Sequence, residues 1–428
     1  MRINEKRLWN HIQTLGQIGK AEDGSVTRLS FTKEDEAAAF QLTEWMREAG
    51  LHVTIDACGN IIGTLKGAEP NLPPVVCGSH FDTVKEGGIF DGCLGVLTGI
   101  EVLQTIREAG IQPQRSIMVI GFRDEEGNRF GYGMIGSRSI CGNVEKDGLL
   151  SVDHKGITLA QAMTQAGYHP ACYVTCQLSS LEAFYEVHIE QADVLAAQNL
   201  SVGIVEGIAG LVRYTVTIYG RSAHAGATPM HRRHDPVTAM SRWILHMTQL
   251  AQQQPHTVAT IGEIHTYPGA CNIICDRVSF SLDLRSLDDA VIQQILDVMQ
   301  EFEEMLEQEQ GVRIERRLEQ QLPAAICDEG LKQELEVCCK TLQLPILRLA
   351  SGAGHDCMNF QGICPTAMIF VRSQHEGASH CKEEYSTQKD CADGCQLLLE
   401  AFRKQLPMHR RLQFCFLFGI MNTVVLTI

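Results

Sequence analysis

The sequence has little positive charge for its length. Of its 428 residues, 36 are lysine or arginine and 51 are aspartate or glutamate, so the formal net charge at pH 7 is −15. Nucleic-acid binding depends on basic side chains that neutralise phosphates, and this balance therefore excludes a nucleic-acid partner. Apolar residues make up 44% of the chain, as in ordinary globular proteins, and the length favours two or three domains.

The sequence also lacks a convincing membrane or export signal. Residues 412–428 carry no charge, but these seventeen residues are fewer than the ~20 that a membrane helix needs. We expect an atypical hydrophobic tail at 407–428 and no membrane partner. Residues 1–7 have no apolar secretory core. The 17 cysteines are scattered without paired metal-ligand spacing, which favours reduced thiols and a cytoplasmic location.

The sequence does contain histidines and carboxylates at the ends of apolar runs. A buried-strand pattern at Pro74–Cys77 leads to His80 and Asp82, which project to the same side of an extended backbone. Asp91 precedes an apolar helical pattern at Leu94–Leu103. Open α/β sheets place their sites at the carboxyl ends of strands. Imidazole with carboxylate suits Zn²⁺, Mn²⁺, Co²⁺ or Ni²⁺, although a strand end followed by a solvated loop explains this stretch equally well.

Similar groups follow later apolar stretches. The fully apolar run Ser116–Phe122 leads into the acidic turn Asp124–Glu126, where adjacent carboxylates are costly unless a cation neutralises them. An alternating strand pattern then carries His188, and two Gly/Ser-rich turns carry His355 and His380. Taken alone, each of these stretches is also explained by a surface turn or by a histidine in the core. A second carboxylate pair at a second strand end shifts the interpretation toward a metal site.

The pattern of elements changes between residues 211 and 325. The order strand, helix, two strands, helix, strand is typical of a ferredoxin-like sandwich. We predict an α/β fold with a mixed-sheet catalytic domain at 1–210 and 326–406, helices on both sheet faces, and an inserted ferredoxin-like α+β domain at 211–325. The predicted elements of the insert are strands at Arg213–Tyr219, Thr257–His265, Arg277–Leu284 and Arg313–Leu318, a helix entered at Asp235-Pro236, and a helix at Ala290–Glu309.

Seven motifs occur in order along residues 5–406. They are Gly78-Ser79-His80-Phe81-Asp82-Thr83, Phe90-Asp91-Gly92, Asp124-Glu125-Glu126-Gly127-Asn128-Arg129-Phe130, Glu186-Val187-His188-Ile189-Glu190-Gln191, Ala223-His224-Ala225-Gly226-Ala227-Thr228-Pro229-Met230, Ser351-Gly352-Ala353-Gly354-His355-Asp356 and Gly377-Ala378-Ser379-His380. Together they resemble the dinuclear-metal amidases that include N-carbamoyl-L-amino-acid hydrolase and allantoate amidohydrolase. That family is related to the zinc aminoacylases and carboxypeptidases.

The resemblance implies two divalent metal ions per subunit, either Zn, Mn, Co or Ni. One ion would be held by His80, Asp91 and His188. The other would be held by Asp91, Glu126 and His380, so that Asp91 bridges the two positions.

The resemblance also assigns roles beside the metals. Asp82 would orient His80, and Glu125 would be the general base for the attacking water. The insert would be a lid and dimerisation domain of a homodimer. Its His224 would reach the partner's active site and stabilise the oxyanion. Substrate binding would fall to five residues, namely Asn272, Arg285, Arg213, Gly354 and His355.

The favoured function is cleavage of the ureido C–N bond of N-carbamoyl-L-amino acids, which are small carboxylate-bearing substrates. Gly207–Leu211 and Ile369–Gln374 favour this branch, whereas Arg213–Thr217 and Ser351–Asp356 are as typical of allantoate amidohydrolases. A peptidase or aminoacylase on the same scaffold is a further alternative. A non-catalytic metal-binding dimer is the last, and the presence of Glu125 argues against it.

Overall fold

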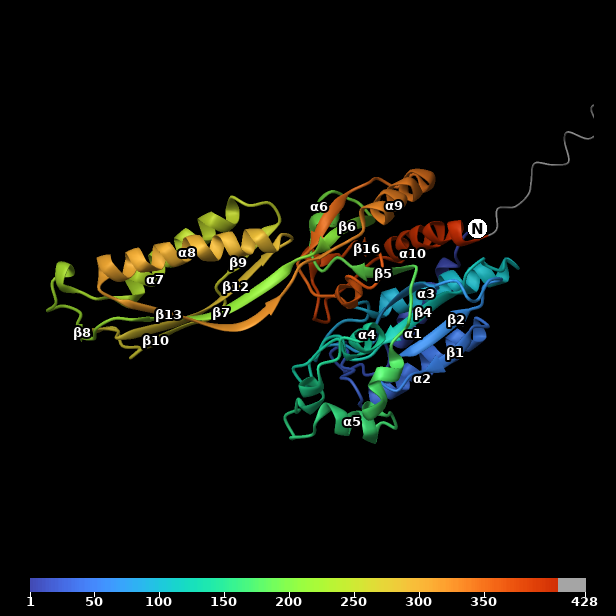
Figure 1. The fold of residues 1–428 in the computed structure, drawn as a ribbon, viewed down its shortest axis with the longest axis horizontal. Coiled ribbons are helices and arrows are strands. Elements are labelled where there is room, and N and C mark those ends of the chain that lie inside the picture. The colour runs from blue at the N-terminus through green and yellow to red at the C-terminus, as the bar shows by residue number, and fades with distance from the viewer. Residues whose placement is uncertain (407–428) are drawn as a thin grey trace, which may run out of the picture.

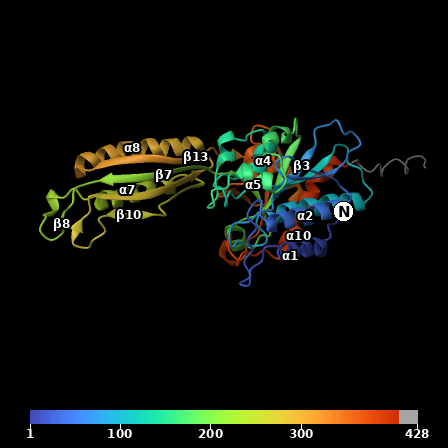
Figure 2. The ribbon, with the colours of Figure 1, turned by 90° about the horizontal axis from the view of Figure 1, so that it is seen from below.

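The computed structural model describes residues 1–406 and has two lobes (Figure 1). The predicted tail at 407–428 lies outside the described residues. A nine-stranded sheet forms the centre of the larger lobe, and a five-stranded sheet forms the centre of the smaller, elongated lobe. The view from below shows the smaller lobe extending away from the larger one (Figure 2).

The large sheet has the strand order β1-β2-β4-β3-β5-β16-β6-β14, and β15 also pairs with β6. Its central strands β4, β3, β5 and β16 are parallel, so their carboxyl ends meet at one edge. The strands are β1 (His52–Ile55), β2 (Ile61–Leu65), β3 (Val75–His80), β4 (Ile117–Phe122), β5 (Ala183–Ile189), β6 (Val202–Ile208), β14 (Ala325–Ile326), β15 (Arg348–Ser351) and β16 (Thr366–Val371).

Helices cover both faces of this sheet, because its central strands are apolar on both sides. In β3, Val75 and Cys77 join one core and Val76 joins the other. The first core is covered by α1 (Glu5–Leu15), α2 (Lys33–Glu48), α3 (Cys93–Glu108), α9 (Glu329–Leu342) and α10 (Gln388–Phe402). The second is covered by α4 (Ile135–Cys141) and α6 (Val194–Ala197), while α5 (Leu159–Gln165) packs in a separate cluster. The predicted mixed-sheet α/β fold with helices on both faces is confirmed.

The smaller lobe is an antiparallel sheet with the order β10-β12-β7-β13, and β9 also pairs with β12. Two helices cover one face through a shared apolar core. The elements are β7 (Gly210–Tyr219), α7 (Pro236–Gln252), β9 (Thr257–Thr260), β10 (Ile264–Tyr267), β12 (Arg277–Ser286), α8 (Asp289–Gln310) and β13 (Arg313–Leu322). A two-stranded ribbon, β8 (Ala223–His224) with β11 (Ile273–Ile274), lies at the far end of this lobe (Figure 1).

The prediction of one strand at Thr257–His265 is wrong, because the chain forms two strands there. Both strands pair with β12, and the turn between them is held by Ser281 of that strand. The Ser281 hydroxyl oxygen accepts hydrogen bonds from the backbone N–H groups of Gly262 and Glu263, each at 3.1 Å. The break is therefore a local bulge in the sheet rather than the end of pairing.

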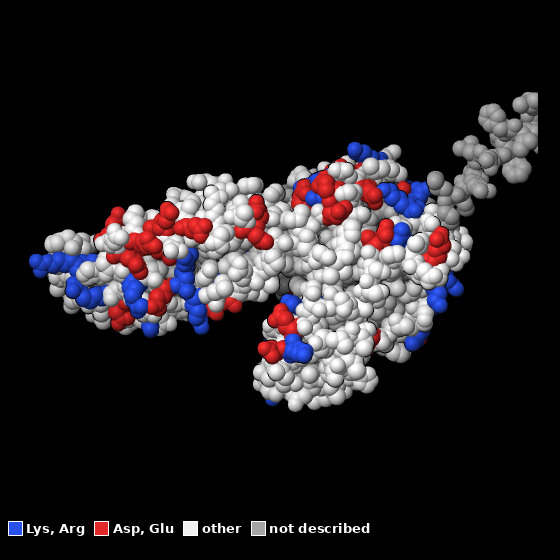
Figure 3. Space-filling model, in the orientation of Figure 1, with Lys and Arg blue, Asp and Glu red and all other residues white. Residues whose placement is uncertain are grey.

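Acidic side chains gather on the face of the smaller lobe that α8 covers (Figure 3). The same view shows lysine and arginine side chains along the lower edge and at the far end of this lobe. These acidic side chains contribute to the net charge of −15.

Candidate metal centre

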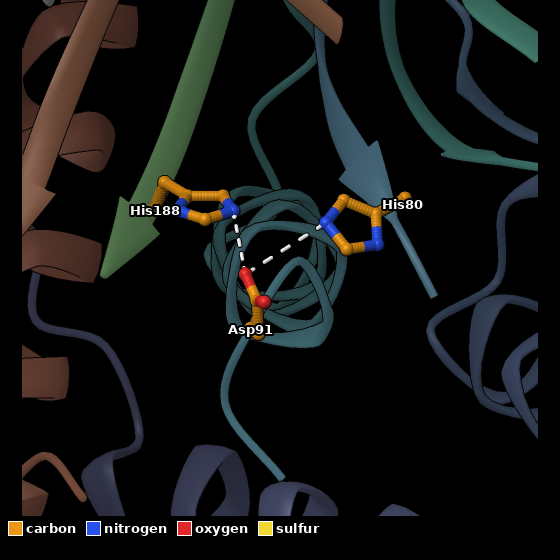
Figure 4. A group of neighbouring side chains, drawn as sticks. All are labelled: His80, Asp91 and His188. Carbon is orange, nitrogen blue, oxygen red and sulfur yellow. Dashed lines mark ion pairs between the residues drawn. The ribbon is translucent and has the colours of Figure 1, made fainter. Parts of the chain in front are cut away.

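The first group of candidate ligands lies at the carboxyl edge of the parallel strands. His80 ends β3, His188 lies near the end of β5, and Asp91 lies in the loop before α3 (Figure 4). One Asp91 oxygen, Oδ1, is 3.1 Å from His188 Nε2 and 3.8 Å from His80 Nε2. All three residues are buried, and their ligand atoms lie within 4.8 Å of one another. The structure thus brings together the three residues predicted for one metal position.

The second group shares Asp91. Its other oxygen, Oδ2, is 3.1 Å from His380 Nε2, and that nitrogen is 3.4 Å from Glu126 Oε1. Glu126 follows β4 and His380 lies in the loop after β16, so both come from the same sheet edge. The side chain of His380 is half exposed, whereas Asp91 is buried. One carboxylate therefore faces both predicted metal positions with different oxygens.

Both buried imidazoles are held in one tautomer. His80 Nδ1 lies 3.1 Å from the carbonyl oxygen of Asp82, and His188 Nδ1 lies 2.9 Å from the carbonyl oxygen of Ile189. A carbonyl accepts only, so each Nδ1 carries a proton and each Nε2 is left to face Asp91. This is the orientation that a histidine ligand of a divalent metal needs.

Glycine is required where α3 begins beneath His80. Gly92 precedes the helix at φ +63°, and a Cβ built there would lie 2.4 Å from the His80 ring. No larger residue fits between the helix start and the imidazole. The Asp91-Gly92 pair therefore lets the helix terminus approach the strand end closely enough for Asp91 to reach both histidines.

The ionisable groups of this centre shift one another's pKa values. Burial opposes ionisation of Asp91, but hydrogen bonding with His188 and His380 holds the pKa of this carboxyl well below its ordinary value. Burial raises the pKa of Glu126 to about 8, and the neighbouring Asp91 charge adds to that rise. The Asp91 hydrogen bond raises the pKa of His380 to about 9. A divalent cation is the group that stabilises several buried carboxylates and neutral imidazoles at once, so the donor set fits a metal.

Glu125 lies beside the first group rather than in the second. Its Oε2 is 3.9 Å from His80 Nε2. Burial raises the pKa of Glu125 well above its ordinary value, His80 opposes this rise, and the charge on Glu126 adds to it. A carboxylate with a raised pKa next to cation ligands can accept a proton from water and release it again.

Asp82 lies beside His80 and also supports the turn after β4. Its carboxylate accepts the backbone N–H groups of Glu125 at 3.1 Å and of Glu126 at 3.3 Å, which fixes the turn after β4. The same carboxylate is 3.5 Å from His80 Nδ1, farther than the Asp82 carbonyl oxygen. Asp82 therefore faces His80 Nδ1 with both its carbonyl oxygen and its carboxylate, and the same carboxylate holds the backbone of the two glutamates.

Two supporting residues were not among the predicted site residues. Gln191 Nε2 donates to Asp91 Oδ1 at 3.2 Å and to the Ser379 hydroxyl at 3.1 Å. The Glu384 carboxylate accepts the backbone N–H of Asp91 at 3.0 Å, and burial raises the pKa of Glu384 to about 7. Gln191 is the last residue of the Glu186–Gln191 motif, and its place in that motif was the sequence signal that could have identified it. Glu384 follows another glutamate in the sequence, and nothing local distinguishes the two.

His355 is buried against this centre. Its ring lies 4.4 Å from that of His188, and its Nε2 is 2.8 Å from the Ser351 hydroxyl. Burial lowers the pKa of His355 well below its ordinary value. Gly354, next to it, is exposed. This turn therefore places a neutral imidazole and an open backbone position at the rim of the site.

The other predicted substrate-binding residues belong to the smaller lobe. Arg213 and Arg285 line a groove of about 720 Å³ on the sheet, and Arg285 Nη1 donates to the carbonyl oxygen of Gly352 in the larger lobe. His224 and Asn272 lie instead at the ribbon at the far end, where Ala225 N–H donates to the Asn272 carbonyl at 3.0 Å (Figure 1). The structure does not bring His224 or Asn272 to the metal centre of its own chain.

Comparison with known proteins identifies the family. Residues 76–404 match the model of peptidase family M20/M25/M40. The chain belongs to this family. It is 45% identical to an N-carbamoyl-L-amino acid amidohydrolase of Geobacillus stearothermophilus, over 92% of this chain and 97% of that protein. It is 32% identical to an allantoate amidohydrolase of Bacillus subtilis, over 92% of this chain and 96% of that protein.

A solved structure agrees with the fold. An amidase of the hydantoinase/carbamoylase family from Burkholderia multivorans superposes with a TM-score of 0.89 at 32% identity, covering 94% of this chain and 98% of that chain. The chain is thus a metal-dependent hydrolase of the M20 fold, related to amidohydrolases that act on non-peptide C–N bonds. Among residues 1–406, no helix is both long enough and apolar enough to span a bilayer.

Proposed function

We propose that this protein hydrolyses the ureido C–N bond of N-carbamoyl-L-amino acids. The observation that carries the proposal is the sharing of Asp91 between two ligand groups with Glu125 beside them. The higher identity to the carbamoyl amino acid amidohydrolase supports this substrate over allantoate. Each turnover consumes one water and releases the L-amino acid, ammonia and carbon dioxide.

Two divalent ions per subunit would occupy the centre, one held by His80, Asp91 and His188 and the other by Asp91, Glu126 and His380. When bound, such ions lower the pKa of water and stabilise the negative charge that develops on the carbonyl oxygen. The ligand set accepts Zn²⁺, Mn²⁺, Co²⁺ or Ni²⁺, because imidazole and carboxylate suit all four.

Glu125 supplies the proton transfers. It accepts the proton of the attacking water and returns it to the leaving nitrogen, so the amine departs neutral. The turn that holds Glu125 is fixed by Asp82, which accepts its backbone N–H. This fixed turn keeps the Glu125 carboxylate beside His80.

Substrate binding falls to the smaller lobe, residues 211–325, which we propose acts as a lid and as a dimerisation domain. Arg285 receives the substrate carboxylate as a two-point fork. His224 and Asn272, at the far ribbon, act on the site of the partner subunit in a homodimer, where His224 stabilises the oxyanion. Their distance from the metal centre of their own chain supports this assignment.

The test is ammonia release by the Mn²⁺-loaded protein. We compare a panel of N-carbamoyl-L-amino acids with allantoate, and each reaction has a matched sample treated with chelator and a third in which Mn²⁺ is added back. Turnover of the carbamoyl amino acids that chelator abolishes and Mn²⁺ restores supports the proposal. Preference for allantoate keeps the site and changes the substrate. If the metal-loaded protein hydrolyses neither kind of substrate, the proposal is contradicted. Acyl amino acids and peptides are then the substrates to test.

A further inference from the structure

Glu384 joins two loops of the metal centre without belonging to either ligand group. It lies before α10 and is 5% exposed. Its Oε1 accepts the backbone N–H groups of Phe90 at 2.8 Å and of Asp91 at 3.0 Å. Its Oε2 accepts the hydroxyl of Ser379 at 3.1 Å. One carboxylate therefore ties the loop that carries Asp91 to the loop that carries His380.

The loop before Asp91 packs directly on this carboxylate. A Cβ built on Gly88 would lie 2.2 Å from Glu384 Oε1, so the backbone there approaches the carboxylate as closely as a glycine permits. The three groups that donate to Glu384 are neutral, two of them backbone amides. Burying a carboxylate against neutral donors is costly, and a shorter or apolar residue would avoid that cost. The burial of the Glu384 carboxylate is therefore better explained by the two loops that it connects.

The hydrogen bonds close into a circuit around the bridging carboxylate. Gln191, after β5, donates from Nε2 to Ser379 Oγ at 3.1 Å and to Asp91 Oδ1 at 3.2 Å. Glu384 completes the circuit from Ser379 to the Asp91 backbone. Three separate segments of the chain are therefore held in one geometry at the point where Asp91 faces His380.

We propose that Glu384 is a positioning residue that sets the placement of Asp91 relative to His380 and so the affinity of the metal position formed by Asp91, Glu126 and His380. This inference rests on the proposed function in needing a metal at that position, but not on the substrate. Residues that orient metal ligands typically change metal affinity by about 10- to 100-fold when they are replaced.

The main experiment compares Glu384→Gln with Glu383→Gln, which makes the same charge change at the exposed neighbouring residue. Metal-free protein is titrated with Mn²⁺ against a chelating dye, and thermal unfolding is recorded with and without Mn²⁺. We expect the weakest-bound Mn²⁺ of Glu384→Gln to bind at least about tenfold less tightly, with Glu383→Gln unchanged. A merely structural role would lower the metal-free and metal-loaded midpoints equally and leave the affinity intact, which would overturn the proposal.

A second variant, Ser379→Ala, keeps the proposal testable if Glu384→Gln does not fold, and the double variant adds a test of coupling if it does fold. Ser379→Ala removes the donor to Oε2 but leaves Glu384 and all predicted ligands in place. We expect Ser379→Ala to weaken the same Mn²⁺ position, and the double variant to weaken it by less than the product of the two single effects. Independent, multiplicative effects would show that Glu384 does not act through this circuit. Because the experiment measures Mn²⁺ affinity, its result does not depend on which substrate the protein hydrolyses.

Discussion

Asp283 holds the guanidinium of Arg285 at two points on the open face of the smaller sheet. Arg285 Nε donates to Asp283 Oδ1 at 2.7 Å, and Arg285 Nη2 donates to Asp283 Oδ2 at 3.0 Å. The pairing lies along one strand, β12, and orients the guanidinium toward Gly352 in the larger lobe. A guanidinium group fixed in this way is preorganised to bind a carboxylate where the two lobes meet.

Arg285→Lys should therefore raise KM for a carboxylate-bearing ureido substrate more than it changes kcat. Lysine keeps the charge but loses the two-point geometry, and a charge-assisted hydrogen bond contributes about 1.5–3 kcal/mol. We expect KM to increase about 10- to 100-fold. Steady-state ammonia release gives both constants, and Arg317→Lys, at an exposed arginine of the same sheet, is the control. An unchanged KM in Arg285→Lys would remove Arg285 from substrate binding.

Glu125→Gln should retain the metal and lose most of the activity. The amide keeps the size of the side chain but cannot accept a proton, and general base catalysis typically contributes about 10²–10⁴-fold. We expect kcat to fall by that range while Mn²⁺ binding, measured by dye competition, stays within about twofold of the original protein. Full activity in a metal-loaded Glu125→Gln protein would show that another group is the base.

Activity should return when two inactive chains are mixed. A His224→Ala chain keeps its metal centre, and a His80→Ala chain keeps its His224. If His224 acts across the dimer, each hybrid contains one complete site, and random pairing of equal amounts gives about a quarter of the original activity. Chains are mixed after mild denaturation and refolded together, with each single variant treated alongside. Failure to recover any activity would place His224 in its own subunit or outside the reaction.

Stability should fall in mild acid partly because of His11. This histidine stacks on Trp45 with ring centroids 4.1 Å apart, and burial, with a further contribution from Arg7, lowers its pKa to about 4. The unfolded chain, whose histidine titrates near 6.5, therefore binds a proton before the folded chain does. The His11 contribution to stability is fully present above pH ~6.5 and is lost as the pH falls toward ~4.

The measurement is the difference in urea midpoint between pH 7.5 and pH 5. His11→Phe keeps the stacking but cannot titrate, so its midpoint should fall less across this interval than that of the original protein. His154→Phe replaces an exposed histidine and should follow the original protein. Equal pH dependence in all three proteins would contradict the assignment to His11.

The sequence predicted the candidate metal ligands better than it predicted the residues that position them. Glu186, His188 and Glu190 alternate along β5 and the residue after it, a spacing that predicts one shared side, yet only His188 of the three faces Asp91. Glu186 instead accepts the Ser79 hydroxyl at 2.7 Å, and Glu190 accepts the backbone N–H of Val194 at 2.9 Å. Periodicity determines the side of a strand on which a residue lies. The residues that pack against that side come from other segments of the chain, which the local pattern does not reveal.

By itself, the sequence determined the strands that lead to His80, Glu126 and His188, the position of Asp91 before a helix, the turn that carries His380, and the family. These follow from local periodicity and from short motifs, which depend on near neighbours in the chain. Only the tertiary structure decided that Glu384 rather than Glu383 supports Asp91, a residue almost three hundred positions away. It also decided that His224 lies apart from the metal centre of its own chain. Such relationships are set by how lobes and loops pack, and that packing leaves no local pattern in the sequence.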